Sequence, residues 1–534
     1  MSSAPTDFWA LPYASQRTPV VADNVVSTSQ PLAAAAGLQM YARGGNAVDA
    51  ALATAMALTV VEPCMNGIGG DAFALVWDGS DLHGLNASGR APNAWSADRF
   101  AALDSMPFRG WDAVTVPGAV SGWRMLSERF GSLPFEDLFE PAIRLAHDGY
   151  IVSPTVHRQW EEQVAELSAQ PGFREAFAPK GRAPHIGERF VCPGQAHTLA
   201  DIARTKGDSF YHGELASAIA AHARATGGLI DERDLAAHQS EWVTPIQTRY
   251  RDLTLHEIGP NGQGIGALMA LGMLDSLGLD AQQPDSGLSM HLQIEAMKLA
   301  FADVYAYVAD PDNMAVTAEQ LLDRDYLAER ARLIDFSRAS YHGAGSPHRG
   351  GTVYLTCADR SGMMVSLIQS NFKGFGSGVV VPGRGIALHN RGWGFSPKAG
   401  HPNQVGPGKR PFHTIIPGFL MRDGKPLSTL GVMGGSMQAQ GHVQMTFRLA
   451  EQGLNPQAAC DAPRWRVKDD NRGVAVEHNT PVDTIEALRG KGHDLTVAAR
   501  FDTEFGCAQM AMRLENGAYV TAADHRKDSC ALGY

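Results

Sequence analysis

The chain has 534 residues, a length that allows several domains of roughly 150 residues each and a large buried core. Its 45 lysines and arginines against 56 aspartates and glutamates give a net charge of −11, with 44% hydrophobic and 19% charged residues. This composition is typical of a globular protein. A mildly acidic surface without a basic stripe argues against nucleic acid and against anionic membranes as partners.

The N-terminal residues 1–17 lack the apolar core of a signal peptide, and no stretch approaches the roughly 18 apolar residues of a membrane-spanning helix. The six cysteines are scattered, with neither a C-x-x-C motif nor the spacing of metal ligands: Cys64, Cys192, Cys357, Cys460, Cys507 and Cys530. Unpaired, packed thiols are typical of a cytosolic protein. We therefore expect a cytoplasmic location.

Hydrophobic periodicity predicts helices and strands that alternate along the chain. Helices are expected at 32–42, 47–60, within 125–152, within 156–178, twice within 199–225, and at 231–238, 262–278, 289–308, 320–334, 438–451, 456–459 and 481–489. Strands are expected at 19–29, 73–77, 82–92, twice within 243–258, and at 353–358, 365–369, 427–432, 474–477, 505–514 and 519–523. Helices around two clusters of strands suit a layered sandwich in which helices cover sheets.

Several local signals refine this pattern. Residues 47–60 are apolar nearly all round and predict a buried helix, whereas 289–308 predict an amphipathic one. Thr480 stands where it can cap the helix at 481–489, with Pro481 at the first helical position. The glycines at 67 and 69 follow a helix and precede a strand, which is the wrong order for a dinucleotide-binding loop.

Residues 348–378 combine a Gly-rich loop with a predicted hairpin. The loop P-H-R-G-G leads to Thr352 at the start of the first strand, and D-R-S-G forms the turn to the second strand. Taken alone, Thr352 is better explained as an ordinary β-branched strand residue than as a functional one.

The segments G-T-V-Y-L-T-C-A-D-R-S-G and S-N-F-K-G-F-G-S-G resemble the processing site of the γ-glutamyltranspeptidase family. R-G-G-N-A-V-D-A-A followed by G-I-G-G-x-x-F, and V-T-V-P-G-A-V-S-G-W, resemble further signatures of that family. The resemblance implies the α+β fold of N-terminal-nucleophile hydrolases, a four-layer αββα sandwich. It also implies cleavage between Gly351 and Thr352, giving a large fragment 1–351 and a small catalytic fragment 352–534 that together form one structural unit.

The resemblance assigns catalytic roles. Thr352 would be the nucleophile, activated by its own freed α-amine, whose reference pKa of roughly 7.7–8.0 suits a general base at working pH. Gly350 and Gly351 would allow the bent backbone that self-cleavage needs. Ser370 matches a hydroxyl that contacts the nucleophile, and Gly434 and Gly435 match the oxyanion glycines. An ordinary strand-to-helix turn is the alternative for the two glycines.

The expected substrate pocket departs from the family. Ser88 stands where the family has an Arg that binds the substrate carboxylate, and Arg90 follows. Arg391 replaces a Gln, and Gly394 replaces the Asp that binds the substrate ammonium. The remaining matching positions are Asn371, Phe372, His413 and Thr414. A pocket that has lost a carboxylate and gained a guanidinium and an imidazole suits an anionic or carbonyl-rich substrate, unless the new Arg and His are merely a surface and a packed residue.

We therefore expect a self-processing amidohydrolase that transfers the acyl group of γ-glutamyl or related small amides mainly to water, because residues 395–409 leave little room for a lid. The alternatives are a non-glutamyl amidohydrolase, resembling oxamate amidohydrolase or cephalosporin acylase, and an inactive descendant that binds small anions. The expected partners are a small amide with a carboxylate and the two fragments themselves, as a homodimer or a heterotetramer. No cofactor or metal is expected, since the histidines show no H-E-x-x-H pattern.

Overall fold

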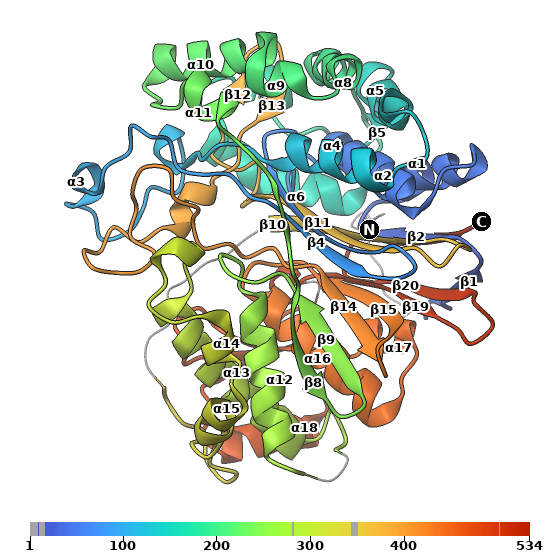
Figure 1. Cartoon of the computed structure of the whole chain (residues 1–534), viewed down its shortest axis with the longest axis vertical. Coiled ribbons are helices and arrows are strands. Elements are labelled where there is room, and N and C mark those ends of the chain that lie inside the picture. The colour runs from blue at the N-terminus through green and yellow to red at the C-terminus, as the bar shows by residue number, and fades with distance from the viewer. Residues whose placement is uncertain (1–8, 10–15, 280–281, 343–350, 501) are drawn as a thin grey trace, which may run out of the picture.

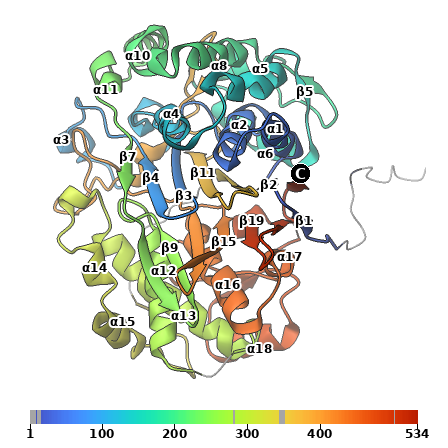
Figure 2. The ribbon, with the colours of Figure 1, turned by 45° about the vertical axis from the view of Figure 1, so that its right-hand side comes forward.

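The computed structural model describes Trp9 and residues 16–279, 282–342, 351–500 and 502–534. Within these ranges, strands form two seven-stranded antiparallel sheets that lie face to face, with helices outside each sheet (Figures 1 and 2). This is the expected four-layer αββα sandwich. The expectations for Gly350 and for most of the N-terminal segment concern residues outside these ranges.

The upper sheet in Figure 1 runs in the order β21 (Cys530–Gly533), β2 (Val25–Thr28), β10 (Gly351–Ala358), β11 (Met364–Phe372), β3 (Asp71–Trp77), β4 (Leu82–Ala87) and β7 (Glu241–Val243). The lower sheet runs in the order β1 (Val20–Ala22), β20 (Tyr519–Ala523), β19 (Ala508–Arg513), β15 (Lys425–Val432), β14 (Gly418–Arg422), β9 (Leu253–Glu257) and β8 (Ile246–Tyr250). Both sheets combine strands from either side of residue 352. The division into fragments 1–351 and 352–534 stays a prediction, but fragments so defined would share both sheets.

Short strands elsewhere form small sheets: β5 (Tyr150–Ile151) with β6 (Arg189–Phe190), β12 (Val380–Val381) with β13 (Ile386–Ala387), and β16 (Trp465–Val467), β17 (Val474–Val476) and β18 (Leu495–Val497) together. Most helices of the first half lie above the upper sheet (Figure 1): α1 (Pro31–Ala42), α2 (Ala47–Val61), α4 (Ala119–Phe130), α5 (Glu140–His147), α6 (Pro154–Leu167), α8 (Pro193–Thr205), α9 (Asp208–His212), α10 (Glu214–Thr226) and α11 (Glu232–Ala236). The same half also contains α3 (Ala97–Phe100), at the left edge of Figure 1, and α7 (Phe173–Phe177).

The helices below the lower sheet come from both sides of residue 352 (Figures 1 and 2): α12 (Gly264–Ser276), α13 (Gly287–Tyr307), α14 (Ala318–Leu321), α15 (Arg324–Ala331), α16 (Met437–Gln452), α17 (Pro456–Asp461) and α18 (Val482–Gly490). No helix among the described residues combines the length and apolarity needed to cross a bilayer.

The two-residue period of β-strands decides which layer each side chain meets. Along β10, Val353 and Leu355 pack in the core beneath α1 and α2, whereas Tyr354 packs in the core between the two sheets. Thr352 shares the parity of Tyr354 and is fully buried on the inter-sheet side. The fold therefore places this hydroxyl between the sheets.

Long, strongly patterned elements agree with the sequence-based expectations. The helix expected at 47–60 is α2, which is buried all round and starts with a capping box between Asn46 and Asp49. The expected hairpin is β10 paired with β11. Five of the six cysteines are buried, and none forms a disulfide.

Four local expectations are wrong. The strand expected at 19–29 is two strands in different sheets, because the chain bends at Asp23 and Asn24. Asp323 caps α15 and so divides the helix expected at 320–334. Helix α13 is mostly buried rather than amphipathic, because it packs against α12, α16 and α18. Thr480 does not cap α18: its hydroxyl has no hydrogen-bond partner.

The two sheets approach each other closely at Gly431 on β15, and a substitution there tests how tightly they pack. A Cβ at Gly431 would lie 2.3 Å from the ring of Tyr354 on the facing sheet. We expect Gly431→Ala to destabilise the fold by about 1–3 kcal/mol, because the ring must shift in a packed core. The measurement is the midpoint of urea unfolding. The control is Gly490→Ala at the end of α18, where nothing lies within 4 Å of the new Cβ; equal stability of the two variants would contradict the packing argument.

Candidate active site

Thr352 and Ser370 lie next to each other on the inter-sheet face, where β10 begins and its partner β11 ends. Along β11, Leu367 packs against the helix layer and Ile368 between the sheets, so Ser370 shares the side of Ile368. Gly351 pairs with Phe372 and Val353 pairs with Gln369, so two residues of β11, Ser370 and Asn371, stand opposite the single residue Thr352 of β10. This is a β-bulge on β11, and bulges re-aim single side chains.

The hydroxyl of Thr352 is held by two side chains. Its oxygen donates to Ser370 Oγ at 3.2 Å and accepts a hydrogen bond from Gln438 Nε2, also at 3.2 Å. Ser370 Oγ in turn accepts the N–H of Phe372 at 2.7 Å, and Gln438 Oε1 accepts the N–H of Ile416 at 3.0 Å. Because each partner is tied to backbone, the hydroxyl has a fixed position and orientation. Sequence reasoning did not identify Gln438.

Gly434 and Gly435 connect β15 to the N-terminus of α16. Their φ angles of 119° and 62° lie in the left-handed region that favours glycine. Gln263 Nε2 donates to the carbonyl of Gly435 at 2.8 Å and so fixes the turn. Within the part of the chain that the structure describes, neither glycine donates a backbone hydrogen bond to another residue. Such N–H groups at a helix N-terminus can hold a developing oxyanion.

Arg391 is a fully buried cation with spare donors. Its guanidinium lies 4.1 Å from the centre of the Phe372 ring, and Nη1 donates to Thr414 Oγ1 at 2.9 Å. Nε and Nη2 have no hydrogen-bond partner among the described residues. Burial lowers the pKa of Arg391 to about 9, although the charge of Asp71 opposes this shift. A buried cation with free donors is costly and is well suited to receive an anion.

His413 is held by Asp71 rather than exposed to the pocket. Its Nε2 lies 3.0 Å from Asp71 Oδ2, and its Nδ1 accepts the N–H of Ile415 at 3.4 Å, so Nε2 carries the proton. Burial, together with the charge of Arg391, lowers the pKa of His413 to about 3 and keeps the ring neutral. Burial alone would raise the pKa of Asp71, but the His389 and His413 rings hold it well below its usual range. Both nitrogens of His413 thus have partners, and its role in substrate binding stays a prediction.

Gly394 has no room for a side chain. A Cβ there would lie 2.5 Å from the carbonyl oxygen of Phe412, so an Asp at this position would require the backbone to move. Asn371 is buried against Gly67 and Gly70, and neither polar atom of its side chain has a hydrogen-bond partner in the described parts of the chain.

Two of the expected substrate-binding residues contact other groups. Ser88 Oγ donates to Asn86 at 2.7 Å and accepts from Asn261 at 3.3 Å. Arg90 is 39% exposed and pairs with Asp310 at 3.2 Å and Glu241 at 3.5 Å. Among the described residues, neither Ser88 nor Arg90 forms a hydrogen bond with Arg391 or Thr352, and the substrate-binding roles of Ser88 and Arg90 stay predictions.

His291, Glu295 and His493 form a group that could hold a metal ion, with ligand atoms within 4.8 Å of one another. Most of their ligand atoms already have partners, since His291 Nδ1 lies 2.8 Å from His493 Nε2 and Lys298 donates to Glu295 at 2.9 Å, whereas His493 Nδ1 has no hydrogen-bond partner among the described residues. Glu295 also accepts the N–H of Ser340 at 2.9 Å. This arrangement is that of a buried polar network that anchors the chain near residue 340.

The chain is similar to known proteins over nearly its whole length. The model of the family described as Gamma-glutamyltranspeptidase matches residues 33–534. The crystal structure of cephalosporin acylase from Bacillus halodurans superimposes with a TM-score of 0.94 at 45% identity, covering 99% of each chain. The oxamate amidohydrolase proenzyme of Klebsiella pneumoniae is 36% identical over 94% of this chain and 97% of its own. The glutathione hydrolase-like YwrD proenzyme of Bacillus subtilis is 34% identical with the same coverage.

Replacing Arg391 should reveal the cost of its unpaired charge. We expect Arg391→Met to raise the free energy of unfolding by about 1–3 kcal/mol, because a flexible apolar side chain removes a buried cation that has few partners. The urea midpoint measures this change. Arg464 is the matched control: it is equally buried but pairs with Asp524 at 2.5 Å, so Arg464→Met should destabilise. Destabilisation by both variants would contradict the view that Nε and Nη2 of Arg391 lack partners within the protein.

Proposed function

Because this chain belongs to the γ-glutamyltranspeptidase family and has the N-terminal-nucleophile hydrolase fold, we propose that it is a self-processing amidohydrolase with Thr352 as its nucleophile. The proposal is supported chiefly by the surroundings of the Thr352 hydroxyl. This hydroxyl is hydrogen-bonded to both Ser370 and Gln438. Gln438 belongs to α16, the helix that follows the turn of Gly434 and Gly435. The names of the relatives, which are proenzymes, support cleavage of a precursor.

The chemistry needs only groups of the chain itself. Thr352 Oγ attacks the carbonyl carbon of the peptide bond that follows Gly351, and that C–N bond breaks as the hydroxyl proton passes to the nitrogen, which becomes the Thr352 α-amine. Water then hydrolyses the ester between Gly351 and Thr352 Oγ, which releases the Gly351 carboxylate and frees the hydroxyl. In the mature enzyme the α-amine takes the hydroxyl proton as Oγ attacks a substrate amide, and it passes the proton to the departing nitrogen. Water then hydrolyses the ester by the same route. The N–H groups of Gly434 and Gly435 stabilise the oxyanion in each step.

The acyl part of the substrate carries a carboxylate. Arg391 supports this choice, because its free Nε and Nη2 donors can bind two oxygens of one carboxylate. The guanidinium also lies on the Phe372 ring and next to Thr414. Thr414 and Gly435 share the donor Gln263 Nε2, which lies 2.6 Å and 2.8 Å from their carbonyl oxygens. The anion site is therefore close to the oxyanion glycines, as a short acyl group requires.

Selectivity for γ-glutamyl groups is the second candidate, and the name of the YwrD relative favours it. A γ-glutamyl substrate also presents an ammonium, for which this pocket offers little. Gly394 has no space for a carboxylate side chain. Asp71 accepts from the N–H of Gly118 at 3.1 Å and from His413 at 3.0 Å, so its oxygens are in use. We therefore favour a non-glutamyl acyl group such as oxalyl or glutaryl.

Water is the proposed acceptor, and the cytoplasm is the proposed compartment. Residues 395–409 are held in place in two ways. An isolated β-bridge joins Ser396 to Gln404, and Phe395 and Val405 pack in a hydrophobic cluster with Trp95. A segment held in this way is a poor lid, and a site without a lid favours hydrolysis over transfer.

The unpaired cysteines support a reducing compartment, such as the cytoplasm.

Self-cleavage is tested by the intact mass of the purified protein and by N-terminal sequencing. We expect two fragments, the smaller beginning Thr-Val-Tyr-Leu. Thr352→Ala should leave a single chain, whereas Thr352→Ser should still be cleaved because it keeps the hydroxyl. The control is Thr356→Ala, which removes a buried hydroxyl on the same strand and face and should not stop cleavage. A wild-type chain that stays intact would support the inactive anion-binding descendant instead.

Acyl selectivity is tested with two anilides that differ by one amino group, glutaryl 4-nitroanilide and γ-glutamyl 4-nitroanilide. We expect kcat/KM to be at least about tenfold higher for the glutaryl compound, because the extra ammonium would be buried without a partner. Oxamate belongs in the same panel, read by ammonia release. Equal or better turnover of the γ-glutamyl compound would contradict the proposed pocket.

A further inference from the structure

Gln438 contacts the proposed nucleophile directly. Its side chain is fully buried and lies in the first turn of α16, just after Gly434 and Gly435. Gln438 Oε1 accepts the N–H of Ile416 at 3.0 Å, and this bond turns the amide nitrogen toward Thr352. Among the described residues, Thr352 Oγ is the acceptor of Gln438 Nε2, at 3.2 Å. The amide is therefore fixed as a hydrogen-bond donor to the reacting oxygen.

Two other buried glutamines of α16 show what a structural glutamine does in this helix. Gln440 accepts the N–H of Val467 at 2.6 Å and donates to its carbonyl at 3.2 Å. Gln444 binds the N–H and the carbonyl of Trp465 in the same way, at 3.2 Å and 2.9 Å. Both side chains join α16 to the backbone of β16. The nitrogen of Gln438 is directed to a hydroxyl instead.

A donor on Thr352 Oγ has opposite effects on the two halves of the reaction. An oxygen lone pair that accepts a hydrogen bond is less available to attack a carbonyl carbon. When the ester is hydrolysed, the same oxygen is the leaving group and takes up negative charge, which a hydrogen-bond donor stabilises. A fixed donor at this position is therefore suited to the step in which Oγ leaves.

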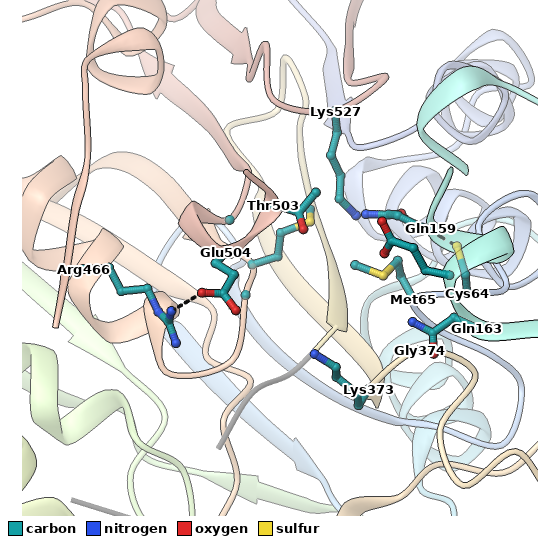
Figure 3. Close-up of a pocket in the computed structure, with 14 residues that line it drawn as sticks. Cys64, Met65, Gln159, Gln163, Lys373, Gly374, Arg466, Thr503, Glu504 and Lys527 are labelled. Carbon is teal, nitrogen blue, oxygen red and sulfur yellow. Dashed lines mark hydrogen bonds and ion pairs between the residues drawn. The ribbon is translucent and has the colours of Figure 1, made fainter. Parts of the chain in front are cut away.

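A cavity beside the glycine turn has room for the water that this step needs. The cavity has a volume of about 100 Å³, enough for several waters, and Gly434, Lys373 and Gly374 form part of its wall (Figure 3). Thr352 and Gln438 are fully buried and are not among the described residues that line it. Water in the cavity thus does not compete for the Gln438 donor, and a hydrogen bond shielded from water is stronger.

We propose that Gln438 is a further catalytic residue, which stabilises Thr352 Oγ as this atom leaves the acyl group. The proposal rests on the proposed amidohydrolase function. Water adds to the ester carbon and gives a proton to the α-amine. The bond between that carbon and Oγ then breaks, its electron pair stays on Oγ, and the α-ammonium returns the proton to Oγ. Gln438 Nε2 stabilises the charge that develops on Oγ before the proton arrives. Self-cleavage ends with the same step, in which Oγ leaves the carbonyl carbon of Gly351.

Gln438→Met removes the donor and keeps an unbranched side chain of similar length. Wild type and variant are mixed rapidly with the anilide that the wild type turns over best, and release of 4-nitroaniline is followed. We expect the variant to give a burst of about one 4-nitroaniline per cleaved chain, because acylation proceeds while hydrolysis of the ester is slow. Its kcat should fall at least about tenfold, and KM should fall by a similar factor, so that kcat/KM stays within about threefold. A merely structural role would lower kcat/KM and give no burst.

Gln444→Met is the matched control, because it makes the same substitution on the same helix away from Thr352. It should lower the urea midpoint and leave KM unchanged, without a burst. Gln438→Glu is a second test variant, which keeps the size of the side chain and the acceptor for the Ile416 N–H but loses the amide donor. It should give the same burst as Gln438→Met.

Self-cleavage offers a measurement that needs no substrate, for the case that Gln438→Met accumulates as an uncut chain. Hydroxylamine attacks esters much faster than peptide bonds, so it should cut this chain before Thr352 and leave a hydroxamate on Gly351, which mass spectrometry detects. An uncut chain that resists hydroxylamine, or a cleaved variant without a burst, would overturn the role of Gln438 while the amidohydrolase stands. A wild-type chain that neither cleaves itself nor turns over any anilide would overturn both proposals.

Discussion

Burial of one hydroxyl between two sheets is the constraint on which the rest of this structure depends. The pairing of β10 with β11 brings Thr352 and Ser370 to the inter-sheet face. A bulge on β11 lies opposite Thr352, whose hydroxyl reaches both Ser370 and Gln438. A one-residue slip in either strand would turn these side chains toward the helix layer. The long antiparallel sheets fix that register through many ladder hydrogen bonds, so the fold itself supplies the precision that the site needs.

The electrostatics of the site are arranged at a cost to stability. Arg391 is buried with two nitrogens that have no hydrogen-bond partner among the described residues, while Asp71 pairs with His389 and His413 beside it. Proteins rarely keep such a cation without a function. An incoming carboxylate would supply the missing partner, so the same residue that weakens the empty fold would select the acyl group.

The elements that could be predicted from the sequence are those that residues close together in the chain determine. Helix α2 follows from an apolar run with a capping box at Asn46, and the hairpin follows from two β-branched runs around a turn. Parts that depend on distant contacts could not be found in this way. Gln438 looks like a surface residue in the run Q-A-Q-G-H, but α16 is covered on nearly all sides and its glutamines bind buried backbone groups. The pairing of His413 with Asp71 joins residues 342 positions apart, and no spacing rule could reveal it.

The covalent intermediate is the most direct test of the account. The enzyme is mixed with a glutaryl ester at low pH, where water attacks slowly because the α-amine is protonated, and is then digested and mapped by mass spectrometry. The account predicts one glutaryl group on the peptide that begins with Thr352, attached at Oγ. A glutaryl group on any other residue, or product release in a burst without an adduct on Thr352, would contradict it.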